Sequence, residues 1–291
     1  MTGKSLTAAL ASGMLVFFLT AAEAAEAPRY VFFPINVPNA TNTVARGIND
    51  AGQIVGYFSD SNGTHAFLLS DGNYTIIDVP HASTQGRGIN ASGQVVGYFT
   101  DSTGTHGFLY TGGNFTKIDV PDARFGTFAI GINNAGYVVG DFFVTEGQQH
   151  GFVDTAQEFM RIDFPEANSG TAATGINDAF QIVGYYDVKQ GFLLVGGQFT
   201  TVDVPGSHYT FPFGINGAGQ IIGFYGARYC EPKRPTHGFV AYGAKFITID
   251  VPNAAQTCAY GINNKGQIVG LYSDGAITHG FLATPENPAE E

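Results

Sequence analysis

Short apolar runs, each bounded by turn residues, fill the chain after its first two dozen residues. Gln53–Phe58 and Tyr74–Val79 are two such runs, and the turn sequences Asn49–Gly52 and Ser70–Asn73 precede them. β-Branched and aromatic residues between Gly, Asn and Asp are typical of strands. No segment between the runs is long and periodic enough for a helix. The pattern therefore predicts an all-β protein of short strands.

The strand pattern repeats six times. The triplet Gly-Ile-Asn recurs at steps of 41, 43, 44, 39 and 47 residues, beginning at Gly47, Gly88, Gly131, Gly175, Gly214 and Gly261. Each repeat predicts four strands. The first contains Gly-Ile-Asn, the second contains Ile-Val-Gly, the third begins at His-x-Phe, and the fourth ends in Ile-Asp-Val-Pro. A period of about 43 residues with four antiparallel strands is typical of propeller blades. We predict a six-bladed β-propeller, with a linear solenoid as the structural alternative.

The two ends of the repeat region complement each other. The last repeat stops after its third strand, His279–Leu282, and lacks the fourth. Near the other terminus, Phe33–Pro38 matches the fourth strand of a typical repeat, which ends in Ile77–Pro80. An open array would need capping repeats, which neither end resembles. We expect the N-terminal strand to complete the last blade and close the ring.

The first 24 residues are predicted to be a signal peptide. Lys4 precedes an uncharged stretch, and Ala22-Glu23-Ala24 matches the A-x-A cleavage pattern. A membrane anchor is disfavoured because the apolar centre is short for a span. We expect export to the periplasm or beyond without membrane insertion, one propeller over residues 25–284, and an acidic C-terminal tail over residues 285–291.

The repeated Gly-Ile-Asn-x-x-Gly-Gln-Ile-Val-Gly followed by His-Gly-Phe-Leu resembles the HAF-repeat family of bacterial extracellular repeat proteins. The resemblance covers essentially all of the chain after residue 24. Only His65-Ala66-Phe67 keeps the three-letter signature, since Gly replaces Ala in most other repeats. The resemblance implies an exported bacterial protein and carries over no catalytic residues.

Composition narrows the function classes. Lys and Arg number 13 against 24 Asp and Glu, and the net charge of −11 argues against nucleic-acid binding. No phosphate-binding loop, dinucleotide fingerprint, Gly-x-Ser-x-Gly or His-Glu-x-x-His motif is present. We therefore predict no cofactor, no metal site and no catalytic residue, and we expect a monomer.

Five of the seven histidines occupy the same place in their repeats. Four stand thirteen residues before the Asp of Ile-Asp-Val-Pro, which predicts the cross-strand pairs His65–Asp78, His106–Asp119, His150–Asp163 and His237–Asp250. Gln190 is expected to face Asp203, and His279 to face Asn36. Because these pairs occur one per blade, they cannot converge on one metal ion.

Loop lengths vary at only one end of the predicted blades. The spans from Gly-Ile-Asn to Val-Gly and from His to Asp are constant, whereas the other two connections vary in length. Variable loops on a rigid scaffold commonly carry function. The candidate ligand-binding residues on this variable face are Arg46, His81, Arg87, His208, Tyr209, Arg228 and Tyr260.

These side chains suit an anionic or sugar-like ligand. The favoured hypothesis is an exported, non-catalytic propeller that binds a glycan, a small anionic ligand or an extracellular surface protein. One alternative is a secreted polysaccharide lyase or lactonase-like hydrolase that uses Arg, His and Tyr at the channel mouth. The others are a structural surface protein without a ligand, and ordinary solvated loops at this rim.

The only two cysteines, Cys230 and Cys258, fall in connections of neighbouring predicted blades on the variable face. An exported protein matures in an oxidising compartment, where such a pair persists as a disulfide. Two unrelated thiols are the alternative, but they fit poorly with cysteines placed only in adjoining loops. We predict a disulfide between Cys230 and Cys258.

Overall fold

The computed structural model describes residues 28–230 and 234–286. The predicted signal peptide, residues 1–24, and all but the first two residues of the predicted tail lie outside this range. The described residues form 24 β-strands and no helix, so they contain no helix that could cross a membrane. The prediction of an all-β protein is confirmed.

The strands group into four-stranded antiparallel units in chain order. The first unit contains β2 (Asn42–Ile48), β3 (Ile54–Asp60), β4 (Gly63–Ser70) and β5 (Asn73–Ile76). The second contains β6 (Ser83–Ile89), β7 (Val95–Asp101), β8 (Gly104–Thr111) and β9 (Asn114–Ile118). The third contains β10 (Thr127–Ile132), β11 (Val138–Thr145), β12 (Gln148–Asp154) and β13 (Phe159–Ile162).

The remaining units follow the same order. The fourth contains β14 (Thr171–Ile176), β15 (Ile182–Tyr186), β16 (Gln190–Val195) and β17 (Gln198–Val202). The fifth contains β18 (Thr210–Ile215), β19 (Ile221–Tyr225), β20 (His237–Tyr242) and β21 (Lys245–Ile249). The sixth combines β22 (Gln256–Ile262), β23 (Ile268–Ser273) and β24 (Thr278–Pro285) with β1 (Tyr30–Ile35) from the N-terminal end.

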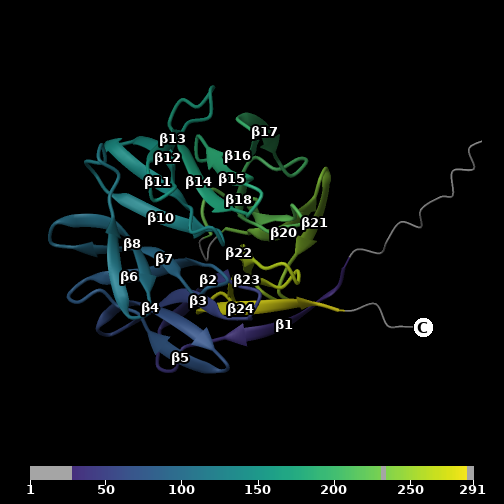
Figure 1. Cartoon of the computed structure of the whole chain (residues 1–291). Helices are drawn as coiled ribbons and strands as arrows, with labels where there is room; N and C mark the ends of the chain where they lie inside the picture. Colours follow the sequence, from purple (N-terminus) through teal and green to yellow (C-terminus); the bar gives the residue numbers. More distant parts are fainter. Residues whose placement is uncertain (1–27, 231–233, 287–291) are drawn as a thin grey trace, which may run out of the picture.

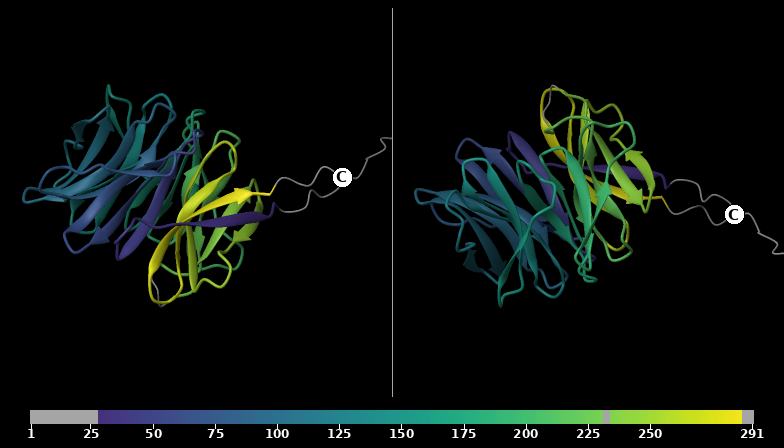
Figure 2. Two further views of the ribbon diagram at one scale, coloured as in Figure 1. Left: turned by 90° about the horizontal axis from the view of Figure 1, so that it is seen from below. Right: turned by 90° about the horizontal axis from the view of Figure 1, so that it is seen from above.

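The N-terminal strand completes the sixth unit. Strand β1 pairs antiparallel with β24, from Tyr30 opposite Pro285 to Ile35 opposite Gly280. Figure 2 shows the two strands side by side. A single parallel pair, Asn42 with Thr278, links the sixth unit to the first. The predicted pairing of the two ends is confirmed.

Figure 1 shows the units following one another around the molecule in chain order. Their first strands line a common central axis. Strands β2, β6, β10, β14, β18 and β22 each contact the next in this order, and β22 contacts β2. Within each unit, the phenylalanine two residues after the His position, which is Gln190 in the fourth unit, is fully buried: Phe67, Phe108, Phe152, Phe192, Phe239 and Phe281. Glycine is required beside these rings, since a Cβ on Gly56 would overlap both the Phe67 ring and the Val44 carbonyl oxygen.

The asparagines of the six Gly-Ile-Asn triplets form a cycle of hydrogen bonds. Each side-chain amide donates to the backbone carbonyl of the corresponding asparagine in the next unit. The cycle runs from Asn49 to Asn90, Asn133, Asn177, Asn216 and Asn263, and Asn263 donates back to Asn49. We call these six residues the asparagine ring. The sixth unit is therefore bonded to the first in the same way as any other neighbouring pair.

Each ring asparagine also holds its own turn. Asn49 Oδ1 accepts hydrogen bonds from the backbone N–H groups of Ala51 and Gln53, at 3.1 and 3.0 Å. Its side-chain amide donates to Gln53 Oε1 at 2.8 Å as well as to the Asn90 carbonyl. The sequence predicted the turn role of this asparagine and not the bond between units. One buried side chain thus fixes a hairpin and an interface together.

We expect Asn49→Ala to lower the free energy of unfolding by at least about 2 kcal/mol, because it removes the partner of the buried Asn90 carbonyl and of two partly buried backbone N–H groups. Asn73→Ala is the matched control, since Asn73 also lies at a turn but is exposed. The control should change stability by no more than about 0.5 kcal/mol. Equal effects of the two substitutions in denaturant unfolding would show that the asparagine ring contributes nothing particular.

Removal of residues 25–38 should cause aggregation. The deletion exposes the full edge of β24 and uncovers Phe281, whose ring lies 5.8 Å from that of Phe32 between centroids. A long unpaired strand edge is a template for association with other chains. Light scattering coupled to size exclusion measures the outcome. A monomeric product with an unchanged melting temperature would contradict the role assigned to β1.

Candidate functional site

Each innermost strand carries a β-bulge at the residue just before Gly-Ile-Asn. The pairing register between the first and second strands skips one residue in every unit: Arg46, Arg87, Ile130, Thr174, Phe213 and Tyr260. A bulge leaves its extra residue outside the ladder and redirects the side chain. All six bulge residues line the space between the innermost strands. The most divergent position of the repeat therefore faces the axis.

A cavity of about 560 Å³ opens on the axis among Arg46, Arg87, Asp141, Phe213 and Tyr260, and we call it the axial cavity. It lies at the variable end of the units, since residues of the β15–β16 and β19–β20 connections also line it. Further along the axis the space narrows to two chambers of about 80 Å³ each, the outer one lined by the asparagine ring. The volume of the axial cavity is in the range of small-molecule pockets.

Two arginines from the first and second units form a cationic wall. Arg46 Nη2 donates to the Tyr57 hydroxyl at 3.5 Å, and its guanidinium carbon lies 3.7 Å from the Tyr260 ring centroid. Arg87 donates to Gln85 Oε1 at 2.9 Å and to the hydroxyl of Tyr98. Cation–π contacts of this kind hold the two guanidinium groups in place.

Neither Arg46 nor Arg87 is paired with a carboxylate among the described residues. Basic residues that do form such pairs include Lys117 with Asp119 and Arg161 with Asp163. The Nε atoms of Arg46 and Arg87 are buried and have no hydrogen-bond partner among the described residues. Buried donors are almost always satisfied, and an exception calls for a missing partner. The cationic wall thus holds two positive charges and two free donors.

Tyr57 lies beside both guanidinium groups. The guanidinium carbons of Arg46 and Arg87 are 5.5 and 5.6 Å from its ring centroid. Burial raises the pKa of this phenol, but the two positive charges outweigh burial, so its pKa is lowered overall. The local potential at this wall is therefore positive and favours anions.

The side of the axial cavity next to the cationic wall contains a carboxyl group. Asp141 on β11 is only 5% exposed, and Gln149 Nε2 donates to its Oδ2 at 3.0 Å. Burial raises the pKa of Asp141 to about 6, against the hydrogen bond from Gln149 and the charge of Arg87. Burial and the carboxylate of Asp141 also raise the pKa of Tyr185, which lines the same arc.

The fifth and sixth units supply an aromatic wall. Phe213 stacks on Phe224 with 5.6 Å between centroids and meets Tyr260 edge-on at 5.0 Å. Phe211 and Leu271 complete this apolar arc. The axial cavity is therefore cationic on one side, carboxyl- and amide-bearing on the next, and apolar on the third.

The predicted disulfide is confirmed and borders the axial cavity. Cys230, in the β19–β20 connection, is bonded to Cys258 across a sequence separation of 28 residues. Cys258 lies within β22 itself, where it pairs with Leu271, and not in the loop that precedes this strand. The bond anchors the segment that carries Arg228 and Tyr229, both of which line the cavity.

The structure brings together four of the seven predicted site residues. Arg46, Arg87, Arg228 and Tyr260 line the axial cavity. The other three are outside its lining. His81 and His208 are exposed in their loops, and Tyr209 stacks against the ring of Phe211 with 6.4 Å between centroids.

Sequence reasoning missed the residues contributed by the second strands. The position after the Gly of Val-Gly holds Tyr57, Tyr98, Asp141, Tyr185, Phe224 and Leu271, and all six line the axial cavity. Asp141 is the one charged residue in this set. Comparison of the six repeats at this position, instead of a search of the loops, would have identified it.

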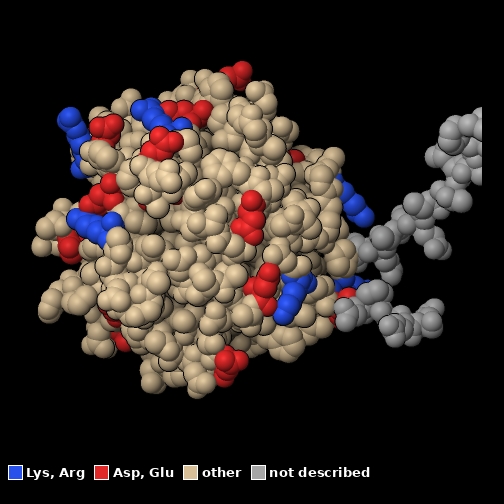
Figure 3. All heavy atoms as spheres, viewed as in Figure 1, with Lys and Arg blue, Asp and Glu red and all other residues tan. Residues whose placement is uncertain are grey.

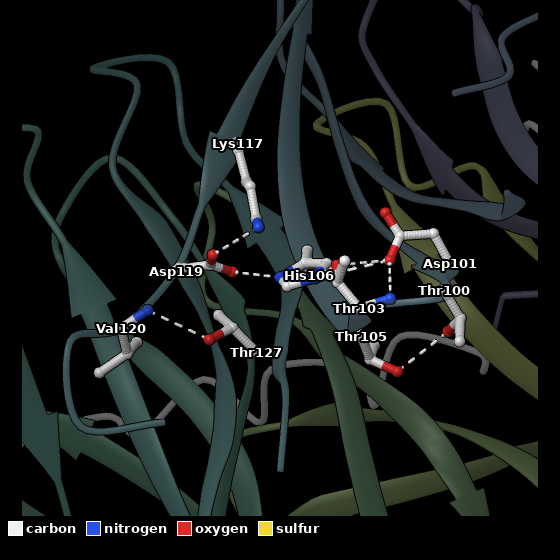
Figure 4. Close-up of polar contacts among 9 residues, drawn as sticks. All are labelled: Thr100, Asp101, Thr103, Thr105, His106, Lys117, Asp119, Val120 and Thr127. Carbon is white, nitrogen blue, oxygen red and sulfur yellow. Dashed lines mark hydrogen bonds and ion pairs between the residues drawn. The ribbon is translucent and has the colours of Figure 1, made fainter. Parts of the chain in front are cut away.

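The repeated histidines form hydrogen bonds in the outer part of each unit, away from the axial cavity. Nδ1 of each contacts the predicted carboxylate, at 2.6 Å for His65–Asp78, 2.9 Å for His106–Asp119, 2.8 Å for His150–Asp163 and 2.7 Å for His237–Asp250. Gln190 likewise bonds Asp203, and His279 bonds Asn36. In Figure 4, Thr103 and Lys117 extend the His106–Asp119 pair. These predicted pairs are confirmed, and the described residues contain no cluster that could hold a metal ion.

Charged residues are sparse over the molecular surface. On the face in Figure 3, basic and acidic side chains are scattered singly or in small groups among uncharged ones. The chain as a whole carries a net charge of −11, yet the lining of the axial cavity contains three arginines and a single carboxyl group. The positive charge of the cavity is thus a local departure from the composition.

Comparison with known proteins identifies the fold. No protein-family model and no curated protein matches the chain. A variant of the Aleuria aurantia lectin bound to Fucα1-6GlcNAc matches with 14% identity and a TM-score of 0.53, over 86% of this chain and 98% of that one. Another structure of this lectin, described as a six-bladed β-propeller with fucose recognition, covers the same shares with 14% identity and a TM-score of 0.50.

A protein provisionally described as a gluconolactonase is also similar. It matches with 10% identity and a TM-score of 0.51, over 88% of this chain and 92% of that one. At such identities the likeness concerns the fold alone. The chain has a β-propeller fold.

We expect Asp141→Asn to remove one component of the pH dependence of stability. The pKa of Asp141 is about 6 in the folded chain against 3.8 ordinarily, so between these values the folded state holds the proton more tightly. Wild-type stability therefore falls as pH rises from about 4 to 6, by on the order of 3 kcal/mol. The variant should gain stability relative to wild type over this window. A stability difference that stays constant from pH 4 to 8 in denaturant unfolding would contradict the assignment.

Proposed function

We propose that this chain is an exported, closed six-bladed β-propeller that binds the acidic end of a glycan in its axial cavity. The ligand class is a carboxylate-bearing saccharide. One observation carries the proposal: Arg46 and Arg87, neither of which forms an ion pair with a described residue, both line a cavity of about 560 Å³. A carboxylate supplies the missing counter-charge through charge-assisted hydrogen bonds.

The rest of the cavity suits a sugar ring. Phe213, Phe224 and Tyr260 offer apolar surface to the ring carbons, while Asp141 and Gln149 offer partners to hydroxyl groups. A few convergent polar groups in a mainly aromatic cavity are the usual composition of a small-molecule site. The similar lectin structures bind fucosylated ligands on the same fold, which supports a glycan as the ligand of this chain.

Three features support the wider proposal. The asparagine ring and the pairing of β1 with β24 favour closure, because they join the sixth unit to the first. The Cys230–Cys258 bond favours maturation in an oxidising compartment. Membership of the HAF-repeat family and cleavage after Ala24 agree with this location and remain proposals.

A concave site favours a small ligand over the other predicted roles. An extracellular protein partner would use a broad surface, and a purely structural protein does not need two arginines without a carboxylate partner in a central cavity. The proposed lyase or lactonase chemistry relied on histidine, but His81 and His208 lie outside the cavity lining. Binding is therefore the function that the geometry supports best.

Isothermal titration calorimetry tests the proposal with D-galacturonate and D-galactose, which differ in one carboxylate. Wild type should bind the uronate and not the neutral sugar. Replacement of both arginines, in Arg46→Gln/Arg87→Gln, should weaken uronate binding by about 2–4 kcal/mol, or roughly 30- to 1000-fold. The carboxylate loses two charge-assisted partners in this variant.

Phe125→Ala provides a matched control. Phe125 is 57% exposed and borders a separate groove of about 580 Å³ between the second and third units. Its replacement should leave uronate affinity unchanged. Equal affinity for galacturonate and galactose, or full affinity in the double arginine variant, would rule out the axial cavity as an anion site.

A further inference from the structure

We propose that Asp141 makes the axial cavity selective for hydroxylated monocarboxylates, by accepting a ligand hydroxyl and repelling a second carboxylate. The inference rests on the proposed function and names its ligand class more narrowly: sugar acids with a single carboxylate, such as uronates. Sugar diacids would be excluded.

The first argument is the position of Asp141 within the repeat. The equivalent residues of the other units are Tyr57, Tyr98, Tyr185, Phe224 and Leu271. Five units thus place an aromatic or aliphatic side chain here, and none of these needs a charge to complete the fold. A buried carboxyl group costs stability unless it is paired and fully hydrogen-bonded. The packing of the third unit therefore does not require the carboxyl group of Asp141.

The second argument is that Asp141 is not the counter-ion of the arginines. No ion pair within 4.0 Å joins it to Arg87 in the described structure, although the charge of Arg87 acts on it. If neutralisation were its role, a bidentate contact with the guanidinium group would be expected. The arginines and Asp141 instead remain separately available to the cavity.

The third argument concerns its free acceptor. Gln149 donates to Oδ2, while no described residue donates to Oδ1. This bond of 3.0 Å fixes the orientation of the carboxyl group. Asp141 Oδ1 is therefore held in a fixed place on the cavity wall with its acceptor capacity unused.

The hydrogen-bonding capacity of the ionised Asp141 carboxylate determines which ligand group can lie beside it. The carboxylate accepts hydrogen bonds and donates none, so it can bind a ligand hydroxyl group. A second carboxylate in place of this hydroxyl would meet a like charge out of water and would bind more weakly. A ligand with one carboxylate on the arginines and a hydroxyl toward Asp141 satisfies both walls.

Two ring-matched probes separate these requirements. In trans-4-hydroxycyclohexanecarboxylate a hydroxyl group stands opposite the carboxylate, and in trans-1,4-cyclohexanedicarboxylate a second carboxylate replaces it. Their dissociation constants are measured by competition against D-galacturonate at pH 8, where Asp141 is ionised. Wild type should prefer the hydroxy acid by at least tenfold.

Asp141→Asn keeps the shape of the side chain and removes its charge. The amide can donate to the second carboxylate, so the variant should lose most of the preference, chiefly through tighter binding of the diacid. Its melting temperature at pH 8 verifies that it folds, since removal of the buried charge should not lower it. Phe125→Ala should keep the wild-type preference.

The outcomes separate the two proposals. Absence of galacturonate binding would overturn the proposed function, and this inference with it. Binding of galacturonate with equal affinity for the two cyclohexane probes would leave the anion site standing and overturn the role of Asp141. An undiminished preference in Asp141→Asn would overturn it as well.

Discussion

The architecture depends on one bifunctional side chain repeated six times. Each ring asparagine closes its own hairpin through Oδ1 and bonds the next unit through its amide, and the last of them returns to Asn49. Both functions need a planar group with an acceptor and a donor at a fixed angle, which the Asn side chain provides. Since these atoms are buried, an unmade bond costs more than a made one contributes. The ring therefore makes correct packing of neighbouring units all but obligatory.

The asparagine ring explains which positions of the repeat are constant and which vary. Gly47 and its counterparts approach each other so closely that a Cβ on Gly47 would lie 3.1 Å from the Gly88 Cα, which leaves no room for variation beside the asparagine ring. One residue earlier, the bulge turns each side chain toward the wider end of the axis. That position is free to differ between units, and it supplies the two arginines of the cationic wall and Phe213 and Tyr260 of the aromatic wall, whereas Asp141 comes from the second strand of its unit.

Repetition explains what could be predicted from the sequence. Four-stranded units, the His65–Asp78 type of pair, and the completion of the last unit by β1 all follow from spacing that recurs, and the structure confirms them. The bulges could not be predicted, because the spacing from Gly-Ile-Asn to Val-Gly is the same in all six repeats, so no repeat without the extra residue is present for comparison. Asp141 could have been found from its place in the repeat, but attention went to His81 and His208, whose loops hold them in solvent.

The most direct measurement of the central claim is side-chain NMR of the arginines during titration with D-galacturonate. The Nε–Hε signals report on the very groups that the structure leaves without partners. If the carboxylate enters the axial cavity, the signals of Arg46 and Arg87 shift saturably, while that of Arg161, which is already paired with Asp163 on the surface, stays in place. Unchanged Arg46 and Arg87 signals at saturating uronate would contradict the account.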